Sequence, residues 1–440
     1  MKPLWITAFN QRPRIALLPD GRLTAVFLQE MGGTQEVSAR YSNDNGLSWS
    51  ETETLFRLPK EPGGWGGLEA LVDRDRELHV FLLNDAHTGI ITTGEERQKP
   101  LPMGERRLDI WHVRSLDGVR TWSSPKCIWK GYTGALNSVI QLRNGRILLP
   151  FSCYTNRSWA NRGEGLDAYT FMGQYDCTLV YSDDAGTTWH PSPAALKVPT
   201  PNLHAYGAVE PVVLELKDGR VWMLIRTQLG RLYESFSEDG ITWSRPRPTP
   251  LLSSDSPVGL VRLSDGRIVL LWNNCLRYPY ALGGRHVLHV AISEDEGRSF
   301  RGYREVVRDP LRNQPPPPRG DHGIAYPFPA LTMDGHIILT TGQGEGRIAV
   351  VRFDPEWLNE AHQREDFSTG LDEGSTFGTK GVELIPHPDE EDATVLWIRK
   401  IDEHWPAAAV WNFPLGLQGR LQTRWLLKSG CAGAHIGLTE

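Results

Sequence analysis

Two side chains suited to nucleophilic chemistry occupy matching places in two repeated segments of this sequence. Glu210 lies near the start of VEPVVLELKDG, and Tyr326 lies near the start of AYPFPALTMDG. Each precedes the glycine of its segment by nine residues, so we expect equivalent points of equivalent strands. A carboxylate beside a phenol can accept the phenolic proton as the oxygen attacks an electrophilic carbon. The pair therefore predicts a carboxylate and a phenol at equivalent axial positions, although an aromatic at a strand start also serves as packing.

Three arginines lie near the same ends of the repeated segments. Arg14 is in RPRI, Arg226 follows Glu210 by sixteen residues, and Arg285 is in GGRHVLHVAIS. Guanidinium groups bind carboxylates through planar, paired hydrogen bonds. If the fold brings the three together, they form a site for one anionic substituent. Otherwise they form ordinary ion pairs or contacts between repeats.

Further polar residues are candidates for the same site. Glu30 and Glu36 are the only carboxylates in FLQEMGGTQEVSARYS, and either can protonate a leaving group if this loop turns inward. Glu69 heads its repeat much as Glu210 does. His204 and His322 precede Glu210 and Tyr326, and they are substrate contacts, proton carriers or surface-loop residues. Two long insertions add the possible contacts Asp85, His87, Arg157 and Asp167.

Six apolar segments with a central polar turn recur along the chain. Each reads as two short strands around a tight turn, usually Asp-Gly or Asn-Gly, which is the sequence signature of a β-hairpin. The segment at 68–83 lacks the turn glycine and is the weakest member. The six segments are 12–27, 68–83, 136–151, 209–225, 257–272 and 326–341.

A second repeat lies between these hairpins: a serine, an aspartate two residues later, then a glycine and an aromatic. Serine and aspartate side chains bond local backbone in such turns, and glycine supplies a left-handed bend. The serines are 73, 67, 55 and 56 residues apart, the size of a small sheet. The five copies begin at Ser42, Ser115, Ser182, Ser237 and Ser293.

Together the two repeats predict an all-β fold, a six-bladed β-propeller whose blades have four strands each. We expect the propeller to span residues 1–355, with the segment at 4–8 adding the outer strand of the last blade. Strand-like pieces after it predict a small C-terminal β-sandwich-like domain at 356–440. Its tryptophans are either a sugar platform or core and interface, and they are Trp397, Trp405, Trp411 and Trp425.

Composition and charge narrow the function classes. The formal net charge is −6 and the sequence has no run of basic residues, so nothing in it indicates nucleic-acid binding. No apolar run approaches the roughly 20 residues of a membrane helix. Five scattered cysteines lack metal-type spacing, so no metal or organic cofactor is implied. The start shows no signal-peptide core, which favours a cytoplasmic protein, although a secreted chain without its export signal looks the same.

The repeated turns, the Arg-Ile strand at Arg14 and the spacing from Glu210 to Arg226 together resemble the sialidase (neuraminidase) superfamily. The resemblance is closest to its bacterial BNR-repeat, or Asp-box, branch and covers roughly residues 10–355. It implies that Arg14, Arg226 and Arg285 clamp a sugar carboxylate, with Tyr326 as nucleophile and Glu210 as base, as in glycosidases that use tyrosine. The segment at 413–440 resembles the small C-terminal β-domain of some members.

One part of the family pattern is missing. The aspartate that serves the family as acid/base lies on the loop after the first strands, and the loop at 27–42 has no aspartate there before its Asp-turn. Glu30 and Glu36 are the substitutes at hand. The departure implies a different acid, a different sugar acid or a lost activity.

The sequence therefore predicts a retaining exo-glycosidase acting on a terminal acidic sugar such as sialic acid. The three arginines should also lower the pKa of Tyr326. Two alternatives stay open: a polysaccharide lyase acting on uronates through Tyr326 and His204, and a non-catalytic glycan-binding propeller. The oligomeric state is not determined by the sequence.

Overall fold

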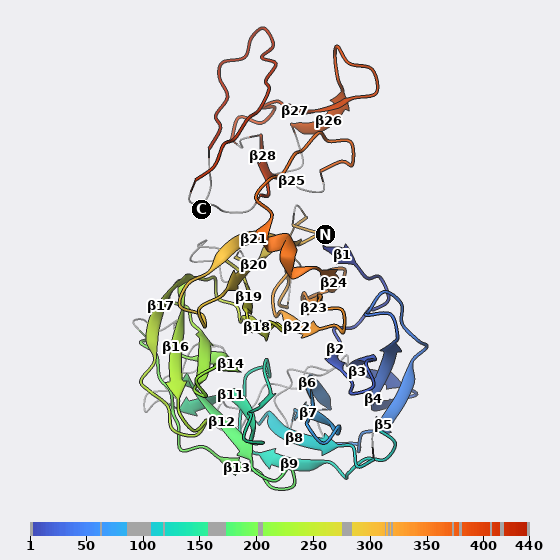
Figure 1. The fold of residues 1–440 in the computed structure, drawn as a ribbon, viewed down its shortest axis with the longest axis vertical. Helices are drawn as coiled ribbons and strands as arrows, with labels where there is room; N and C mark the ends of the chain where they lie inside the picture. The colour runs from blue at the N-terminus through green and yellow to red at the C-terminus, as the bar shows by residue number, and fades with distance from the viewer. Residues whose placement is uncertain are drawn as a thin grey trace, which may run out of the picture.

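The computed structural model is a ring of six four-stranded antiparallel sheets with a smaller β-region beyond it (Figure 1). It describes residues 3–437 except 62–63, 86–106, 118, 157–172, 201–205, 275–283, 313, 316, 318–319, 372–373, 378–380, 405–406 and 414–417. The predicted six-bladed propeller is confirmed.

The first three blades follow the chain in order. Blade 1 contains β2 (Arg14–Leu17), β3 (Leu23–Met31), β4 (Thr34–Ser42) and β5 (Glu53–Arg57). Blade 2 contains β6 (Trp65–Val72), β7 (Leu78–Asn84), β8 (Asp109–Arg114) and β9 (Lys126–Trp129). Blade 3 contains β10 (Ile140–Gln141), β11 (Ile147–Asn156), β12 (Gly173–Ser182) and β13 (His190–Pro191).

The other three blades complete the ring. Blade 4 contains β14 (Val209–Glu215), β15 (Val221–Arg226), β16 (Arg231–Ser237) and β17 (Arg247–Leu252). Blade 5 contains β18 (Gly259–Arg262), β19 (Ile268–Trp272), β20 (Val287–Ser293) and β21 (Arg301–Arg308). Blade 6 contains β22 (Phe328–Leu331), β23 (Ile337–Thr341), β24 (Ala349–Phe353) and the N-terminal β1 (Leu4–Trp5).

Blade 6 closes the ring with strands from both ends of the propeller. β1 pairs antiparallel with β24, with Leu4 opposite Arg352 and Trp5 opposite Val351. This confirms the expected outer strand at the N-terminus. Joining the ends in one sheet removes an exposed pair of sheet edges.

The second strand of each blade is the apolar centre of its sheet. β7, β15, β19 and β23 are buried along their whole length. They are rich in Val, Ile and Leu because each lies inside its sheet and is covered by the neighbouring blades. This packing gives the axial strand ends a rigid base.

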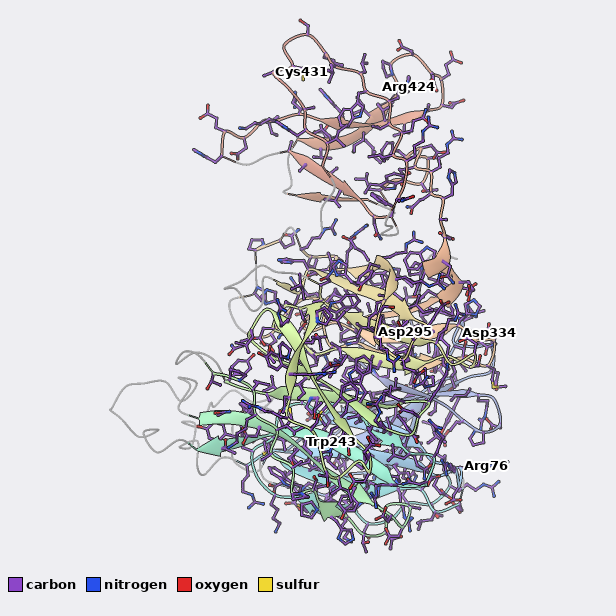
Figure 2. All side chains as sticks on the ribbon, turned by 60° about the vertical axis from the view of Figure 1, so that its left-hand side comes forward. Arg76, Trp243, Asp295, Asp334, Arg424 and Cys431 are labelled. Atoms are coloured by element: carbon purple, nitrogen blue, oxygen red, sulfur yellow. The ribbon has the colours of Figure 1, made fainter. Side chains whose placement is uncertain are left out.

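Local backbone chemistry forms the turns as the sequence predicts. The turn glycines of five hairpins adopt positive φ, and in the weakest copy Arg76 takes this conformation at φ 71°. In the first Asp-turn, Ser42 Oγ donates to Asp44 (2.8 Å) and accepts from the Gly46 amide (2.8 Å). Asp295 marks the fifth Asp-turn in Figure 2.

The second Asp-turn is built differently. Ser115 Oγ accepts from the Leu78 amide of β7 at 2.9 Å instead of contacting the turn aspartate. Among the described residues of this turn, Asp117 accepts from the amides of Arg120 (3.1 Å) and Thr121 (2.6 Å).

The chain after the propeller begins with a short 3₁₀ helix, η3 (Pro355–Asn359). Two two-stranded sheets follow: β25 (Gly374–Phe377) with β28 (Ala408–Trp411), and β26 (Val382–Pro386) with β27 (Thr394–Ile398). This region projects from one side of the ring (Figure 1). The domain boundary at 355/356 stays a prediction.

A few polar contacts join this region to blade 5. The Asn412 side chain accepts from the Glu305 amide (3.2 Å) and donates to the Glu305 carbonyl (3.0 Å), as a neighbouring strand would. Arg304 of β21 donates to the Trp357 carbonyl at 2.8 Å. β21 is therefore the anchor of the C-terminal region on the propeller.

The last two pieces expected as strands lie at 419–430 and 434–440. The described residues of 418–437 form no strand, and all of them are exposed. Of the tryptophans there, Trp425 is exposed, Trp397 and Trp411 are half-buried, and Trp405 lies outside the described residues, so the choice between a sugar platform and core or interface stays a prediction. In the described part of the chain, no helix has the length and apolar character needed to cross a membrane.

Candidate active site

A left-handed kink begins the inner strand in three alternate blades. Glu210 has φ 49° and Tyr326 has φ 61°, and the equivalent residue of blade 2, Gly67, has φ 44°. Positive φ is strained for residues with a side chain and persists where the surrounding fold enforces it, commonly at functional sites. The kink accompanies a break in strand register between Val209 and Val212. The predicted equivalence of Glu210 and Tyr326 therefore extends to backbone conformation.

The kinks bring the two side chains together at the axis. Tyr326 Oη donates to Glu210 Oε1 at 2.7 Å, although 116 residues separate them in the chain. Arg226 donates to the same phenol oxygen at 3.1 Å and forms an ion pair with Glu210. All three side chains are buried. The arrangement can move the phenolic proton to Glu210 beside a fixed positive charge.

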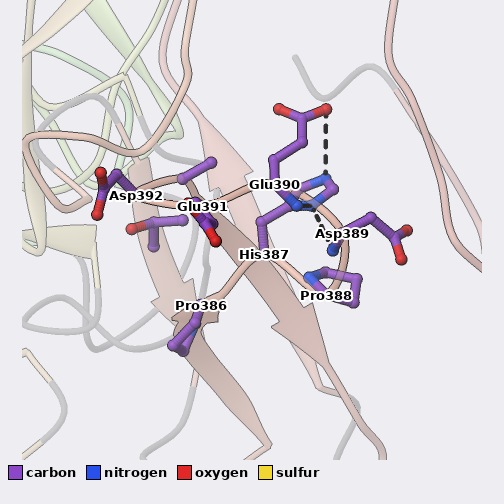
Figure 3. Close-up of a pocket in the computed structure, with 9 residues that line it drawn as sticks. Pro386, His387, Pro388, Asp389, Glu390, Glu391 and Asp392 are labelled. Carbon is purple, nitrogen blue, oxygen red and sulfur yellow. Dashed lines mark hydrogen bonds and ion pairs between the residues drawn. The ribbon is translucent and has the colours of Figure 1, made fainter.

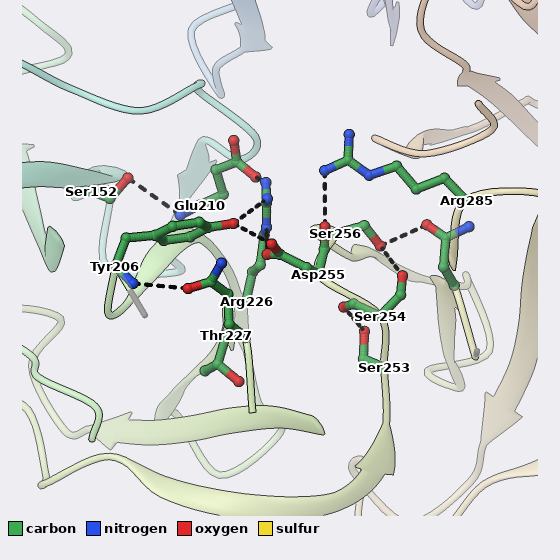
Figure 4. Close-up of polar contacts among 12 residues, drawn as sticks. Ser152, Tyr206, Glu210, Arg226, Thr227, Ser253, Ser254, Asp255, Ser256 and Arg285 are labelled. Atoms are coloured by element: carbon green, nitrogen blue, oxygen red, sulfur yellow. Dashed lines mark hydrogen bonds and ion pairs between the residues drawn. The ribbon is translucent and has the colours of Figure 1, made fainter. Parts of the chain in front are cut away.

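Arg226 is held by more groups than the sequence indicated (Figure 4). Its Nε donates to Asp255 at 2.7 Å and its Nη2 donates to the Tyr206 hydroxyl at 2.7 Å. Tyr206 in turn donates to Asp255. Although burial opposes it, the Arg226 charge holds the pKa of Asp255 below its usual range. Asp255, in SSDSPV, lies four residues before β18 begins at Gly259, and the nine-residue offset does not identify it.

Arg285 lies on the other side of the Tyr326 ring. Its Cζ is 5.6 Å from the ring centroid, and Nη2 donates to the Asp255 carbonyl at 2.9 Å. Nη1 donates to Gln343 at 2.7 Å and forms an ion pair with Asp321 at 3.4 Å. Its buried Nε has no hydrogen-bond partner among the described residues. Arg226 and Arg285 thus both lie beside Tyr326, but each is already paired with internal carboxylates, so their role as an anion clamp stays a prediction.

Arg14 has a different setting. Its Nε donates to Glu69 at 3.1 Å, and its Cζ lies 3.1 Å from the centroid of the Phe328 ring. Burial lowers the pKa of Arg14 to about 10, which leaves it charged at neutral pH. The sequence placed Glu69 near the axis but not opposite this arginine. The guanidinium that the resemblance assigns to the substrate already has an internal carboxylate.

A fourth arginine, missed in the sequence, stands beside the tyrosine. Arg12 Cζ is 5.3 Å from the Tyr326 centroid and 5.5 Å from that of Phe328. Arg12 precedes the turn glycine Gly21 by nine residues, the same offset that singled out Glu210 and Tyr326. Applying that offset to blade 1 would have found it.

The electrostatics of Tyr326 correct one expectation. Burial and the nearby Glu210 carboxylate raise the pKa of Tyr326 above its ordinary value, and the opposing effect of Arg226 and Arg285 is smaller. The expected lowering by the arginines was wrong because desolvation of the phenolate outweighs their attraction. The resting side chain is a neutral phenol that donates its hydrogen bond to Glu210.

Neither candidate acid contacts the Tyr326 cluster in the described structure. Glu36 accepts from Gln29 (2.8 Å) and Thr54 (2.9 Å), and these hydrogen bonds lower its pKa. A carboxyl group with a lowered pKa is almost fully ionised at neutral pH, so it rarely carries a proton to donate. Glu30 is exposed near the end of β3. The acid/base assignment of either residue stays a prediction.

The histidines and the insertion residues add little. His322 lies on the loop before Tyr326, and its recorded contact is a 3.5 Å approach of Nδ1 to the Gly320 carbonyl. Asp85 is buried, and its amide donates to the Gly64 carbonyl at 3.0 Å. His204, His87, Arg157 and Asp167 lie outside the described residues.

The described residues form no metal-binding group, and a hollow that they line lies in the C-terminal region, away from this cluster. Among the residues that the structure describes, no three His, Cys, Asp or Glu side chains gather in a metal-binding group. A hollow at the β26–β27 turn is lined by residues 386–394, with His387 near Glu390 (Figure 3). It is an open turn in the C-terminal region, so the axial cluster is the candidate active site.

Comparisons with known proteins point to one family. The family described as "BNR repeat-like domain" matches residues 72–339. A sialidase of Micromonospora viridifaciens is 25% identical over 325 residues, covering 66% of this chain and 44% of that protein. A sialidase of Clostridium perfringens is 26% identical over 282 residues, covering 59% of this chain and 68% of that protein. The chain thus spans less than half of the Micromonospora protein.

A solved structure shares the fold. The K499G mutant of NanB sialidase from Streptococcus pneumoniae superposes with a TM-score of 0.51 at 15% identity, covering 78% of this chain and 68% of that chain. At this identity the likeness establishes the propeller architecture and nothing finer.

Proposed function

Because the chain belongs to the BNR repeat-like domain family of the sialidase superfamily, we propose that it is an exo-glycosidase that removes a terminal acidic sugar, such as a sialic acid, from glycans. The observation that carries the proposal is the buried hydrogen bond of 2.7 Å from Tyr326 to Glu210. Arg226 and Arg285 flank the same phenol. A nucleophile, a base and two cations thus surround one point on the axis.

The chemistry of a sialoside explains why these residue types fit. Its anomeric carbon bears a carboxylate, which repels a carboxylate nucleophile, whereas a neutral phenol approaches without that penalty. Tyr326 Oη would attack the anomeric carbon while Glu210 accepts the phenolic proton. The bond to the leaving oxygen breaks as that oxygen gains a proton from an acid, for which Glu30 and Glu36 remain the candidates. Water then cleaves the tyrosyl adduct, so the anomeric configuration is retained.

The test is hydrolysis of a fluorogenic sialoside by the full chain. We expect wild-type turnover, and a fall in kcat of at least about a thousandfold in Tyr326→Phe, since removing the nucleophile removes the covalent route. Tyr41→Phe, on β4, is the matched control and should keep wild-type kcat. Equal turnover by Tyr326→Phe and wild type would refute the nucleophile.

Two other outcomes would replace the proposal. Sialoside binding without turnover would make the propeller a glycan-binding protein. New ultraviolet absorbance from a uronate polymer, without sialoside cleavage, would indicate a lyase. Either result leaves the fold intact and removes the glycosidase assignment.

A further inference from the structure

Four arginines surround the inner strand starts of blades 1, 4, 5 and 6, but they differ in their partners. Arg14 pairs with Glu69, Arg226 pairs with Glu210 and Asp255, and Arg285 pairs with Asp321. Arg12 has no carboxylate within ion-pair distance among the described residues. Its one recorded acceptor is the Gly342 carbonyl, 3.3 Å from Nη1.

The surroundings of Arg12 suit a binding role. A guanidinium has five N–H donors, so most of those on Arg12 lack a described acceptor. The side chain is half-buried, which leaves part of it open to a ligand. It lies over Tyr326 and Phe328, whose faces attract a cation. Glu210 and Glu69 attract Arg12 from beyond ion-pair distance, so its donors beside Tyr326 remain available to an anion.

We propose that Arg12 is the guanidinium that anchors the carboxylate of the substrate, and that Arg14 is a positioning residue. This inference rests on the proposed function, because it names the group that grips the sugar acid. Arg14 is fixed between Glu69 and the face of Phe328, and Phe328 also lies under Arg12. Arg14 therefore fixes the position of the Phe328 ring, which Arg12 also contacts.

Calorimetric titration tests the assignment without requiring turnover. The probes are N-acetylneuraminate and galacturonate, each compared with its uncharged methyl ester. We expect Arg12→Gln to weaken binding of whichever acid binds wild type by about 10- to 100-fold, the range for a charge-assisted hydrogen bond. Binding of the ester should change little. Arg22→Gln, at an exposed ion pair in the same blade, is the matched control and should bind as wild type does.

The outcomes separate this inference from the proposed function. Weaker acid binding in Arg12→Gln than in wild type, together with tighter acid binding in Arg12→Lys than in Arg12→Gln, supports the anchor. This holds even if the wild type cleaves no sialoside. Unchanged acid binding in Arg12→Gln overturns it, as does a wild type that binds neither acid. An equal loss for acid and ester also overturns it, because a merely structural role would affect both.

A second, independent observation concerns the segment at 420–428, RLQTRWLLK, which we call the tail strand segment. Leu421, Thr423, Trp425 and Leu427 alternate along it as the apolar face of a strand would. In the described structure Trp425 is 46% exposed and Leu427 is 62% exposed. Among the described residues of 418–437, the one recorded backbone hydrogen bond joins Cys431 to Lys428. The sequence has the pattern of a strand, but the described segment has no backbone hydrogen bonds to a neighbouring strand.

The same chain carries the complementary surfaces. β26 and β27 form a sheet of only two strands, which is marginal alone and leaves both edges open among the described strands. Their turn has four acidic residues at 389–392, while the tail strand segment has Arg420, Arg424 and Lys428. Within the chain, Arg424 forms an ion pair with Glu390 at 3.6 Å and Lys428 Nζ lies 5.2 Å from the centroid of the Trp397 ring, but no described backbone hydrogen bond joins the segment to this sheet.

We infer that the tail strand segment pairs with the C-terminal region of a second copy of this chain. The pairing would extend a two-stranded sheet, cover the apolar face and match basic residues to the acidic turn. Because each copy has both the strand and the open edges, two copies satisfy each other in one symmetric contact. Arg424 lies at the far end of the C-terminal region, away from the propeller, so this contact leaves the blades free (Figure 2).

Sedimentation velocity of the full chain is the test. We expect the wild-type chain to self-associate at about 50 micromolar. In the double variant Trp425→Asp, Leu427→Asp, the Kd of self-association should rise by at least about tenfold. Met333→Asp, which replaces another exposed apolar residue on the propeller, is the control. Hydrogen exchange at 420–428 should be slow in the assembly and fast in the double variant. A wild-type monomer, or an assembly that the double variant leaves unchanged, would overturn the inference.

Discussion

Replacing Glu69 with glutamine should destabilise the propeller strongly, because it leaves the Arg14 charge buried without a counter-ion. The side chains of Arg14 and Glu69 are only 7% and 9% exposed. Removing one partner of a buried ion pair costs about 3–5 kcal/mol in free energy of unfolding. Burial already lowers the pKa of Arg14 to about 10 with Glu69 present, so loss of the carboxylate lowers it further.

A matched exposed pair lies in the same blade. Arg22 and Asp20 are 2.8 Å apart, with side chains 44% and 51% exposed. Exposed pairs of this kind contribute about 0–1 kcal/mol, so Asp20→Asn should have little effect. The two substitutions therefore differ mainly in burial, and their difference should be about 2–5 kcal/mol.

Urea unfolding followed by tryptophan fluorescence measures both variants at pH 7. We expect Glu69→Gln to lower the midpoint clearly and Asp20→Asn to stay near wild type. If the two variants lose the same stability, Arg14 is not a buried, internally compensated charge. The argument that separates Arg14 from Arg12 would then fail.

Two further predictions concern stability. Burial lowers the pKa of His289 to about 4. As pH falls, His289 therefore takes up a proton in the unfolded chain before it does in the folded chain. The free energy of unfolding should decline below about pH 6.5 by up to about 1.4 kcal/mol per pH unit. Urea midpoints of His289→Gln should show a shallower decline between pH 6.5 and 4.5, and an equal slope would contradict this. Gly207→Ala should lower the thermal unfolding midpoint more than Gly145→Ala. Both glycines have similar positive φ, 98° and 96°. Only at Gly207 would the new Cβ lie 2.5 Å from another atom, the carbonyl oxygen of Tyr175. Equal losses would show that strain in φ alone decides.

The architecture was readable in the sequence because propeller blades are built from local patterns. Each hairpin is specified by alternating apolar strands and a turn glycine, and each Asp-turn by residues within one short segment. The missing turn glycine of the second hairpin was also visible in the sequence, and in the structure Arg76 adopts the left-handed conformation there. The shared offset from the turn glycine also predicted that Glu210 and Tyr326 are equivalent.

The partners of the axial side chains could not be read in the same way. Arg14 and Arg226 look alike in the sequence, yet one contacts Glu69 and the other lies beside Tyr326, because strand starts from different blades meet only when the ring closes. The pKa of Tyr326 rises because closure also removes water, which no spacing of arginines reveals.

The tail strand segment also shows that sequence alone does not determine which neighbours a segment finds. Its residues determine a strand pattern, but a strand exists only when another edge supplies the hydrogen bonds. The sequence by itself thus determined the blades, their turns and the residue types on the axis. The tertiary structure decided which charges are compensated and which are left open, since compensation depends on neighbours that are distant along the chain.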